Sequence, residues 1–427
     1  MLTTERPTVR VNDRLFDAGT LRILDLHADY QCANTGHCCG RAWNIRISDR
    51  EHGRLTDALR RAGRGPEEIE RHFFAAGGDG AEQRWQFARA ASGRCIFNGA
   101  GACGESTCNA QRELGHEVLP DVCQSFPRLA VATPAGIYLT LSYTCPTAVK
   151  SLLSEDRLAE VAPRAVFQHH PRLQGASFGP GAELPWFGQQ PTASWEAWDY
   201  FWRWASQFAA RAEFTPAQAL YLIGQAVAHV ERNAPATGRL DVLVDLLDQI
   251  GALPAADLRR HCAAIAPLTE LGATYLSVIL NVLASCGVVP EILRGARETL
   301  ARPGSPEREA LLREYDARVR PRLAEFERIE RNWVASRLYA NPLIYQAKHL
   351  RVGYFLAVLN LIQWRFTALL LALRDGTGIE EQILLRAAAE TDHLLQHNAA
   401  VTRRMLELLR REAAAAALEH LARPALF

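Results

Sequence analysis

Cysteine is concentrated at one end of this chain of 427 residues. Of its ten cysteines, only Cys262 and Cys286 lie beyond residue 145. The other eight are Cys32, Cys38, Cys39, Cys95, Cys103, Cys108, Cys123 and Cys145. Thiols at this density in a cytoplasmic chain usually serve metal or redox chemistry. The pattern predicts that the N-terminal third has its own chemistry and that these eight cysteines are its metal ligands.

Three kinds of cysteine site compete for this spacing. Disulfides are disfavoured by the expected compartment and by the adjacent pair Cys38-Cys39. Structural zinc sites usually pair cysteines about two to four residues apart, and no Cys-x2-Cys occurs in the chain. Iron–sulfur clusters also take thiolates, and the eight thiols suffice for one four-thiolate site with some to spare, or for two sites. We predict an iron–sulfur cluster of the 4Fe-4S type, with zinc as second choice and His37 as a weaker candidate ligand.

Composition and charge exclude several other classes of protein. Hydrophobic residues make up 48% and charged residues 22% of the chain, which is typical of a globular protein and not of collagen, a disordered chain or a polytopic membrane protein. The 48 basic and 47 acidic residues leave a net charge of +1. Such a balance argues against a nucleic-acid partner, because a binding face for nucleic acid normally needs an excess of Lys and Arg.

The chain also predicts a cytoplasmic protein without a membrane partner. Its first residues, MLTTERPTVRVNDRLF, have neither the apolar core nor the small-residue cleavage site of a secretion signal. The best membrane-span candidate is residues 354–373, which carry Asn360, Gln363 and Arg365 near the middle. A central Arg costs about 2.5–3.5 kcal/mol on insertion scales. We therefore interpret this segment as a buried helix.

The fold class expected is mainly α, with a small loop-rich α+β domain before a large all-helical region. Residues 1–150 form the predicted cysteine-cluster domain, with strand-like pieces at 129–133 and 136–141 separated by Pro134-Ala135. Residues 151–192, rich in Pro and Gly toward their end, form the predicted connecting segment, and 193–427 the helical domain.

Apolar periodicity and capping residues carry the helical prediction. An apolar stripe steps by three and four residues along one helix face, through Trp195, Trp198, Trp202, Ala205 and Ala209. Helix starts are indicated by Thr215-Pro216-Ala217-Gln218 and by Ser305-Pro306-Glu307. Further helical runs are predicted at 239–252, 268–286, 305–340, 350–374 and 379–419.

The residues around the cysteines resemble a known family. Cys32-Ala-Asn-Thr-Gly-His-Cys38-Cys39, Gly93-Arg-Cys95-Ile-Phe and Leu119-Pro-Asp-Val-Cys123-Gln-Ser-Phe-Pro127-Arg128 are similar to the YkgJ-type cysteine-cluster proteins. The longer pattern, from Cys108 through Leu141-Ser-Tyr-Thr-Cys145-Pro146, resembles the flagellin lysine-N-methylases, the FliB family. Glu330-Arg-Asn332-Trp333 and Tyr339 resemble the helical portion of that family.

This resemblance implies a protein-lysine N-methylase that uses S-adenosylmethionine, carries an iron–sulfur cluster and acts on flagellin or another protein substrate. The glycine-rich turn and the Cys-x3-Cys-x2-Cys run that bind this donor in other enzymes do not occur in the chain. Because only a neutral lysine amine attacks a methyl group, a base is also needed, and the candidates are Asp121, Tyr138 and Tyr143. Arg128 is a candidate to support a cluster or bind a carboxylate, with a surface salt bridge as its ordinary role.

A second class of function stays open beside the enzyme. The cysteine domain could hold zinc or iron for storage, delivery or scaffolding, while the helices bind a partner. A simple metal-binding module needs no large helical core, whereas recognition of a folded protein substrate can use such a surface. This consideration favours the enzyme.

Overall fold

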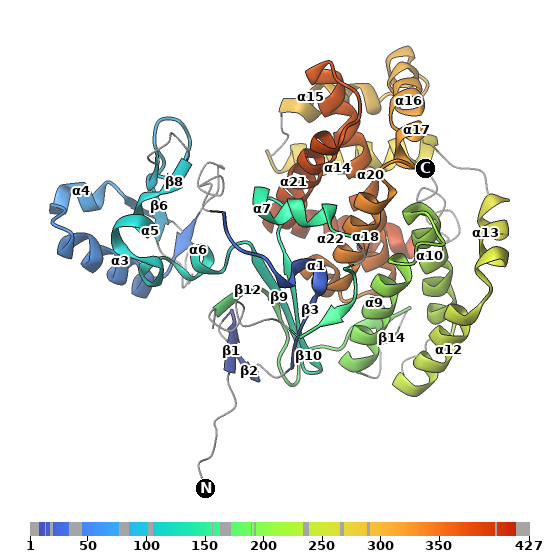
Figure 1. The fold of residues 1–427 in the computed structure, drawn as a ribbon, viewed down its shortest axis with the longest axis horizontal. Coiled ribbons are helices and arrows are strands. Elements are labelled where there is room, and N and C mark those ends of the chain that lie inside the picture. The colour runs from blue at the N-terminus through green and yellow to red at the C-terminus, as the bar shows by residue number, and fades with distance from the viewer. Residues whose placement is uncertain are drawn as a thin grey trace, which may run out of the picture.

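The fold combines one seven-stranded sheet, a small lobe and a large set of helices (Figure 1). The computed structural model describes residues 8–12, 14–17, 20–33, 45–76, 85–100, 106–155, 157–162, 172–188, 190–191, 194–233, 239–264, 269–287, 291–397 and 399–415. In Figure 1 the small lobe lies to the left, the sheet in the lower middle and most of the helices to the right.

Seven strands form the main sheet in the order β11-β3-β10-β9-β12-β1-β2. They are β1 (Thr8–Val11), β2 (Arg14–Asp17), β3 (Leu21–Leu24), β9 (Arg128–Thr133), β10 (Gly136–Leu141), β11 (Glu160–Val161) and β12 (Arg172–Ser177). The antiparallel pair β9 and β10 confirms the two strands predicted around Pro134-Ala135, with Thr133 opposite Gly136. Every residue of β10 is buried. These two strands therefore form the middle of the sheet.

Strand β12 lies in the stretch expected to be a connecting segment. It pairs in parallel with β9 on one side and with β1 on the other. Gly175 allows this close pairing, because a Cβ at that position would lie 1.9 Å from the Ala130 carbonyl oxygen. The local sequence gives little sign of a strand, because β12 is held in place by its pairing with β9 and β1, which lie far from it in the sequence.

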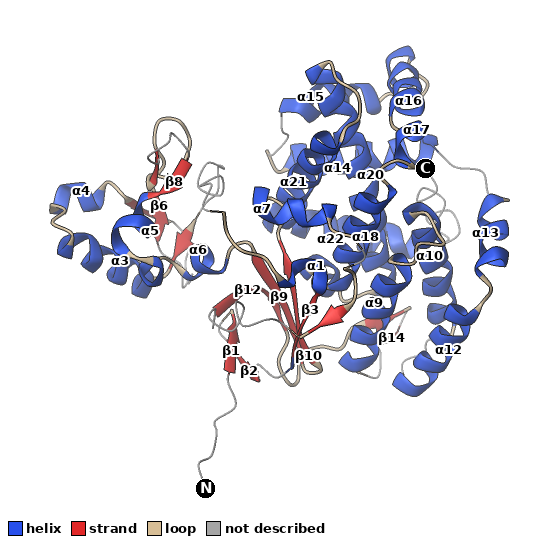
Figure 2. Cartoon of the chain, in the orientation of Figure 1, coloured by secondary structure: helices blue, strands red, loops and turns tan. Residues whose placement is uncertain are grey.

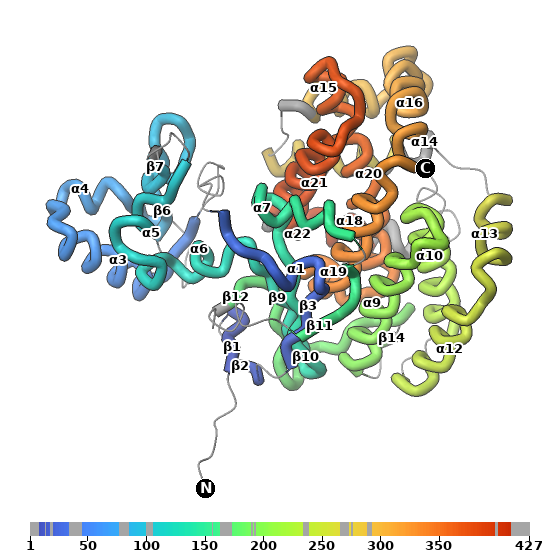
Figure 3. Tube along the Cα trace, viewed as in Figure 1, coloured from blue at the N-terminus to red at the C-terminus, as the bar shows by residue number. Residues whose placement is uncertain are grey.

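The small lobe is an insertion between α1 (Asp25–Ala28) and β9. Its elements are β4 (Arg46–Ile47), α3 (Asp49–Arg61), α4 (Pro66–Glu70), β5 (Phe73–Ala75), β6 (Trp85–Phe87), β7 (Asn98–Ala100), β8 (Ser106–Cys108), α5 (Asn109–Leu114), η2 (His116–Val118) and α6 (Asp121–Ser125). The colour gradient in Figure 3 shows the chain leaving the sheet after α1 and returning to it through α6. The lobe has its own core, whose buried side chains all lie between Ile47 and Leu119.

Helices make up most of the remaining described residues, which confirms the prediction of a mainly α fold (Figure 2). Short elements α7 (Pro146–Val149), η3 (Lys150–Leu153), β13 (Trp186–Phe187) and β14 (Gln190–Pro191) precede them. The helices are α9 (Trp195–Ala209), α10 (Pro216–Arg232), α12 (Leu240–Ala252), α13 (Ala255–Ala263), α14 (Thr269–Ser285), α15 (Glu291–Leu300), α16 (Pro306–Arg318), α17 (Arg320–Leu323), α18 (Glu327–Tyr339), α19 (Pro342–Ala347), α20 (Leu350–Asp375), α21 (Glu381–Gln396) and α22 (Ala399–Ala415).

The local signals for helices hold in detail. All five residues of the predicted α9 stripe are buried. Thr215 and Gln218 form a capping box at the start of α10, and Ser305 caps α16 by accepting from the Arg308 N–H. The run predicted at 305–340 divides into α16, α17 and α18. Pro321, which has no N–H to donate, lies close to the first division.

The apolar segment proposed as a buried helix is α20, and the structure confirms that prediction. It is the one helix among the described residues that is long and apolar enough to cross a membrane, and 89% of its apolar window is buried inside the protein. Its central Arg365 donates to the equally buried Glu330 at 2.5 Å. Gly353 lets α20 approach α9, because a Cβ there would lie 2.6 Å from Cζ2 of Trp202.

One large core joins the sheet to the helices. It runs from Val9 in β1 to Leu409 in α22 and includes Leu173 of β12 and Trp198 of α9. The boundaries expected at 150 and 192 do not separate the two cores, because strands from both sides of residue 150 share one sheet and buried side chains from both sides of residue 192 share one core. The unit with a separate core is the inserted lobe.

Candidate metal centre

The described cysteines of the N-terminal third lie in two groups. Cys95, Cys108 and Cys123 pack, half-buried, against the core of the small lobe. Cys32 follows α1, where the chain leaves the sheet. Cys145 comes directly after the turn that follows β10. The second group therefore belongs to the sheet side of the junction between lobe and sheet.

Short β pairings and one helix hold the lobe cysteines. Cys95 forms a β-bridge with Arg89, and its carbonyl accepts the Asn98 N–H at 2.9 Å. Asn98 in turn pairs with Cys108 across the β7–β8 hairpin. Cys123 lies in α6, the last element of the lobe before the chain returns to the sheet.

Helix α3 fixes the position of α6. Glu51 accepts the Asp121 N–H at 2.8 Å, and the Arg54 guanidinium donates to the Leu119 carbonyl at 2.7 Å. The same guanidinium lies 3.5 Å from the Asp121 carboxylate. The start of the Leu119–Arg128 motif is thus held by contacts with a helix far from it in sequence.

The sheet-side group combines two thiols with a buried phenol and a buried guanidinium. The Tyr30 hydroxyl is hydrogen-bonded to Cys145 Sγ at 3.4 Å, and the Arg128 guanidinium lies over the Tyr30 ring at 5.2 Å. Burial raises the pKa of Tyr30, and its contacts with Cys145 and Cys32 raise it further. Arg128 is only 6% exposed. It is therefore no surface salt bridge, but a buried cation beside two cysteines.

Three of the predicted ligands, Cys38, Cys39 and Cys103, lie outside the described residues, as does His37. Within the described ranges, no three His, Cys, Asp or Glu side chains form a group that could hold a metal ion. The donor chemistry itself, thiols with a neighbouring guanidinium, fits an iron–sulfur cluster or zinc.

Cys262 and Cys286 lie far from this region of the fold. Cys262 is buried in α13, and burial raises the pKa of its thiol. Cys286 closes the last turn of α14, where its N–H donates to the Val282 carbonyl, and Gly287 follows with φ of 69°. Both places agree with the expectation that these two cysteines fill helical cores.

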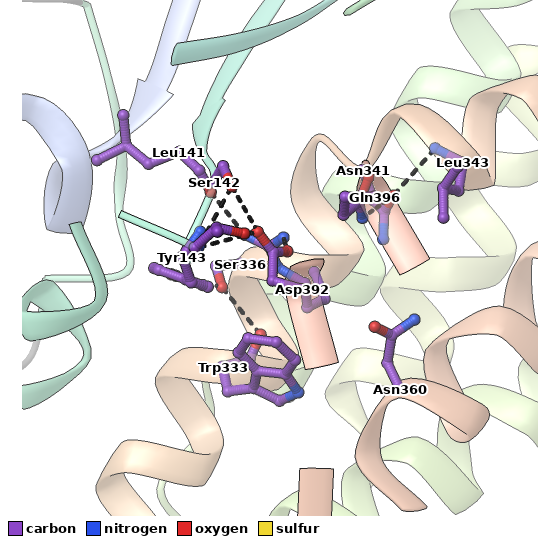
Figure 4. A network of polar contacts seen from close by, with 12 residues as sticks. Leu141, Ser142, Tyr143, Trp333, Ser336, Asn341, Leu343, Asn360, Asp392 and Gln396 are labelled. Atoms are coloured by element: carbon purple, nitrogen blue, oxygen red, sulfur yellow. Dashed lines mark hydrogen bonds and ion pairs between the residues drawn. The ribbon is translucent and has the colours of Figure 1, made fainter. Parts of the chain in front are cut away.

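A buried ion pair anchors the turn between β10 and Cys145 to the helices (Figure 4). One oxygen of Asp392 in α21 accepts from the Ser142 hydroxyl at 2.7 Å and from the Tyr143 N–H at 2.8 Å. The other accepts from Arg337 of α18 at 2.5 Å. Arg337 also donates to the Leu141 carbonyl at 2.9 Å. These contacts, here called the Asp392 network, join the last cysteine motif to two helices.

Further polar groups extend the Asp392 network. Ser142 lies 2.6 Å from His397 Nε2, just beyond α21. The Tyr143 hydroxyl donates to Ser336 at 2.8 Å and lies 2.8 Å from His27 Nε2. Burial, with Arg337 nearby, lowers the pKa of His27 to about 3, and burial raises that of Tyr143 to about 12. Both side chains are therefore neutral near pH 7.

The α18 residues that carry the C-terminal part of the resemblance all make specific contacts. Asn332 donates to the carbonyls of Leu152 and Ser154, at 2.9 and 2.8 Å. The Trp333 ring packs against Tyr143 with centroids 5.4 Å apart. The Tyr339 hydroxyl donates to Glu160 at 3.1 Å. This strip of α18 is therefore where the helices contact the segment that follows the cysteines.

The three candidate bases differ in their surroundings. Tyr138 and Tyr143 are buried, and burial raises the pKa of each phenol. Asp121 keeps 23% of its side chain exposed beside Arg54, two residues from Cys123. Of the three, only Asp121 is within reach of a protein substrate in this conformation.

A polar cleft of about 650 Å³ lies between β11, α9 and α18, away from the described cysteines. Glu160 lines it, 11% exposed, and accepts both hydrogen bonds of the Arg203 fork at 2.7 Å. Behind Glu160, the rings of Tyr339 and Tyr138 meet edge to face at 6.0 Å. Sequence reasoning did not find this cleft, because Glu160 lies in the expected connecting segment and its partners come from two distant helices.

Asp199 is a second feature that the sequence did not reveal. It lies inside the α9 apolar stripe, is 1% exposed and accepts from the Thr133 hydroxyl at 2.5 Å. Burial raises its pKa to about 7, against the opposing hydrogen bonds of Thr133, Tyr138 and Tyr345. A carboxyl group on the apolar face of a helix was the available signal.

Comparisons with known proteins found no relative of this chain. No family model, no curated protein and no solved structure matches this chain. The functional argument therefore depends on the cysteine motifs and on the geometry described above.

Proposed function

We propose that this protein is a cytoplasmic protein-lysine N-methylase that uses S-adenosylmethionine and carries an iron–sulfur cluster on its N-terminal cysteines. Its substrate in this proposal is flagellin or another protein with exposed lysines.

The observation that carries the proposal is the Asp392 network. The two stretches that resemble the methylase family, the Leu141–Pro146 motif and the 330–339 strip of α18, are far apart in sequence but share this buried network. A cysteine module with an unrelated helical partner would not need so specific a junction. The contact supports a single unit in which metal site and helices act together.

The cysteines are the residues proposed to hold the cluster. Cys95, Cys108 and Cys123 would contribute from the lobe, Cys32 and Cys145 from the sheet side, and the remaining ligands would be Cys38, Cys39 and Cys103. When bound, a cluster supplies one-electron redox chemistry. Arg128 would balance the negative charge of thiolates on the sheet side.

The chain itself must make a lysine amine neutral before methyl transfer. The reference pKa of lysine is about 10.4, so the enzyme has to desolvate the amine or accept its proton. Asp121, partly exposed at the start of α6, is the proposed acceptor, and Arg54 holds its carboxylate in place. The broad helical surface is available to dock a folded substrate.

The test is mass spectrometry of flagellin and of the whole proteome from cells with and without this gene. The expected result is an increment of about 14 Da, one methyl group, on specific lysines only when the gene is present. A strain with Cys123→Ser should lose the modification, whereas the matched Cys286→Ser strain should keep it.

If no lysine differs between the strains, and labelled donor does not bind the intact metal-loaded protein, the methylase proposal fails. The alternative would then replace it: a non-catalytic zinc- or iron-binding protein whose helices bind a partner. Metal bound in stoichiometric amount without methylation would be the sign of that alternative.

A further inference from the structure

Hydrogen bonds connect the elements that line the polar cleft between β11, α9 and α18. Ser206 of α9 donates to the Ala335 carbonyl of α18 at 2.8 Å, which joins the two helices. Asn332 of α18 holds the segment before β11 through the Leu152 and Ser154 carbonyls. The cleft is formed by the folded chain without a ligand, as small-molecule sites usually are.

Positive charge dominates the lining of this cleft. Arg203, Arg328 and Arg331 face one carboxylate, Glu160. The bidentate pair with Glu160 neutralises Arg203. Arg328 and Arg331 remain, three residues apart on α18 and therefore neighbours on one helix face.

The present partners of these two arginines leave donors unused. Arg331 donates from Nη2 to Glu327 at 2.5 Å, but its Nε is buried and has no acceptor among the described residues. Arg328 donates to Glu155 at 2.5 Å, and the Glu155 side chain is 81% exposed. Exposed pairs of this kind contribute little, so a ligand can displace Glu155 at small cost.

We propose that this cleft binds a small anionic molecule whose carboxylate or phosphate group accepts hydrogen bonds from Arg328 and Arg331. Guanidinium forks match both groups in geometry and charge. The cleft volume, about 650 Å³, is in the range of small-molecule sites. The Arg331 guanidinium, 14% exposed and paired through Nη2 with Glu327, would gain a second acceptor.

A cationic ligand fits this cleft less well. Glu160, the one carboxylate among the described lining residues, already accepts two hydrogen bonds from Arg203 and one from Tyr339. The inference stands apart from the proposed methylase activity, although S-adenosylmethionine has a carboxylate and is therefore one of the molecules to be tried.

The test is isothermal titration calorimetry of the full chain with three probes: inorganic phosphate, citrate and S-adenosylmethionine. Saturable binding of at least one probe is expected, with weaker affinity at high salt because ionic contacts are screened. Comparing the probes distinguishes a phosphate ligand, a simple carboxylate and the methyl donor as sources of the anion.

Two substitutions locate the binding. Arg331→Gln and Arg328→Gln should each weaken it about tenfold or more, since each removes charge-assisted hydrogen bonds. Arg313→Gln, on the exposed face of α16, is the matched control and should leave it unchanged. Arg328 is 42% exposed, so its variant should fold even where Arg331→Gln does not. The proposal is overturned if no probe binds, or if binding survives the Arg328 substitution at full strength.

Discussion

At the scale of single residues, Asp199 shows most clearly how the fold changes the protonation of a side chain. Its carboxyl group is buried among the Thr133 hydroxyl and the phenols of Tyr138 and Tyr345, with the Arg203 guanidinium as the nearby cation. The pKa of Asp199 rises from 3.8 to about 7 because burial penalises the charged form. The folded protein therefore holds a proton that the unfolded chain releases at lower pH.

This proton makes the stability of the folded protein depend on pH, with a sign that follows from the raised pKa of Asp199. Stability from Asp199 is fully present below about pH 4 and is lost as the pH rises to about 7, a change on the order of 4 kcal/mol. Asp199→Asn should remove this slope, so the free energy of unfolding of wild type relative to the variant should fall over that range. Urea unfolding of both proteins at a series of pH values measures it.

The exposed Asp245 of α12 offers the matched substitution, and Asp245→Asn should leave the slope unchanged. A constant difference between wild type and Asp199→Asn from pH 4 to 7 would show that the carboxyl group is not held protonated.

The cysteines allow a second prediction at this scale. Protein purified without oxygen should be brown and contain roughly four irons per chain. Single serine substitutions at the eight N-terminal cysteines should lower the metal content or abolish folding. Substitutions at Cys262 and Cys286 should do neither, because both pack in helical regions. Metal analysis with absorption spectra checks each variant.

Two outcomes would contradict this prediction. Stoichiometric zinc with no iron would exclude the cluster and leave the zinc alternative. Metal loss on changing Cys262 or Cys286, with the N-terminal eight unaffected, would show that the ligands had been assigned to the wrong cysteines.

At the scale of elements, the Asp392 network determines how α18 and α21 meet the turn after β10. Asp392 and Arg337 are 0% and 2% exposed, so each charge depends on the other. Asp392→Asn should leave Arg337 buried without a counter-charge and lower the free energy of unfolding by about 3–5 kcal/mol. Chemical denaturation measures this as a lower midpoint with an unchanged slope.

Asp375, at the end of α20, is the control for that change. Its ion pairs with Arg374 and Arg386 are largely exposed, so Asp375→Asn should alter the midpoint little. Equal effects of the two substitutions would mean that the Asp392 pair adds nothing specific to the fold.

The elements also show what could be predicted from the sequence. Helix α9, the caps of α10 and α16, and strands β9 and β10 were predicted because their signals are local: a periodic stripe, a capping box, a two-residue turn. Strand β12 was not predicted, because it is held in place by strands that lie far from it in the sequence. The role of Asp392 was not predicted either, because its contact with Ser142 joins residues that are 250 positions apart in the sequence.

The candidate site divides in the same way. Cysteine type and spacing identified the candidate ligands, since a thiol carries its chemistry wherever it lies. Arg128 is buried beside Tyr30 because α1, β9 and the turn after β10 pack together in the folded protein. No local sequence pattern predicts this packing.

At the scale of the whole molecule, the inserted lobe is the part that can be separated. Its core lies entirely between Ile47 and Leu119, while the other core needs strands and helices from both ends of the chain. A fragment cut at residue 150 would keep β9 but lose its partner β12 and every helix from α9 onward. It should therefore aggregate, because it exposes apolar surface and an unpaired strand edge.

The fragment 45–125 should instead stay soluble and fold in a metal-dependent way. Its core is small, and domains of about this size gain only a few kcal/mol from apolar burial. It retains Cys95, Cys103, Cys108 and Cys123, whose thiolates would add binding free energy to folding. Circular dichroism melts with added zinc or iron, and again after chelation, should show a transition at higher temperature with metal. A fragment that melts identically under both conditions would show that the lobe cysteines bind no metal by themselves, and that any cluster also requires the cysteines on the sheet side.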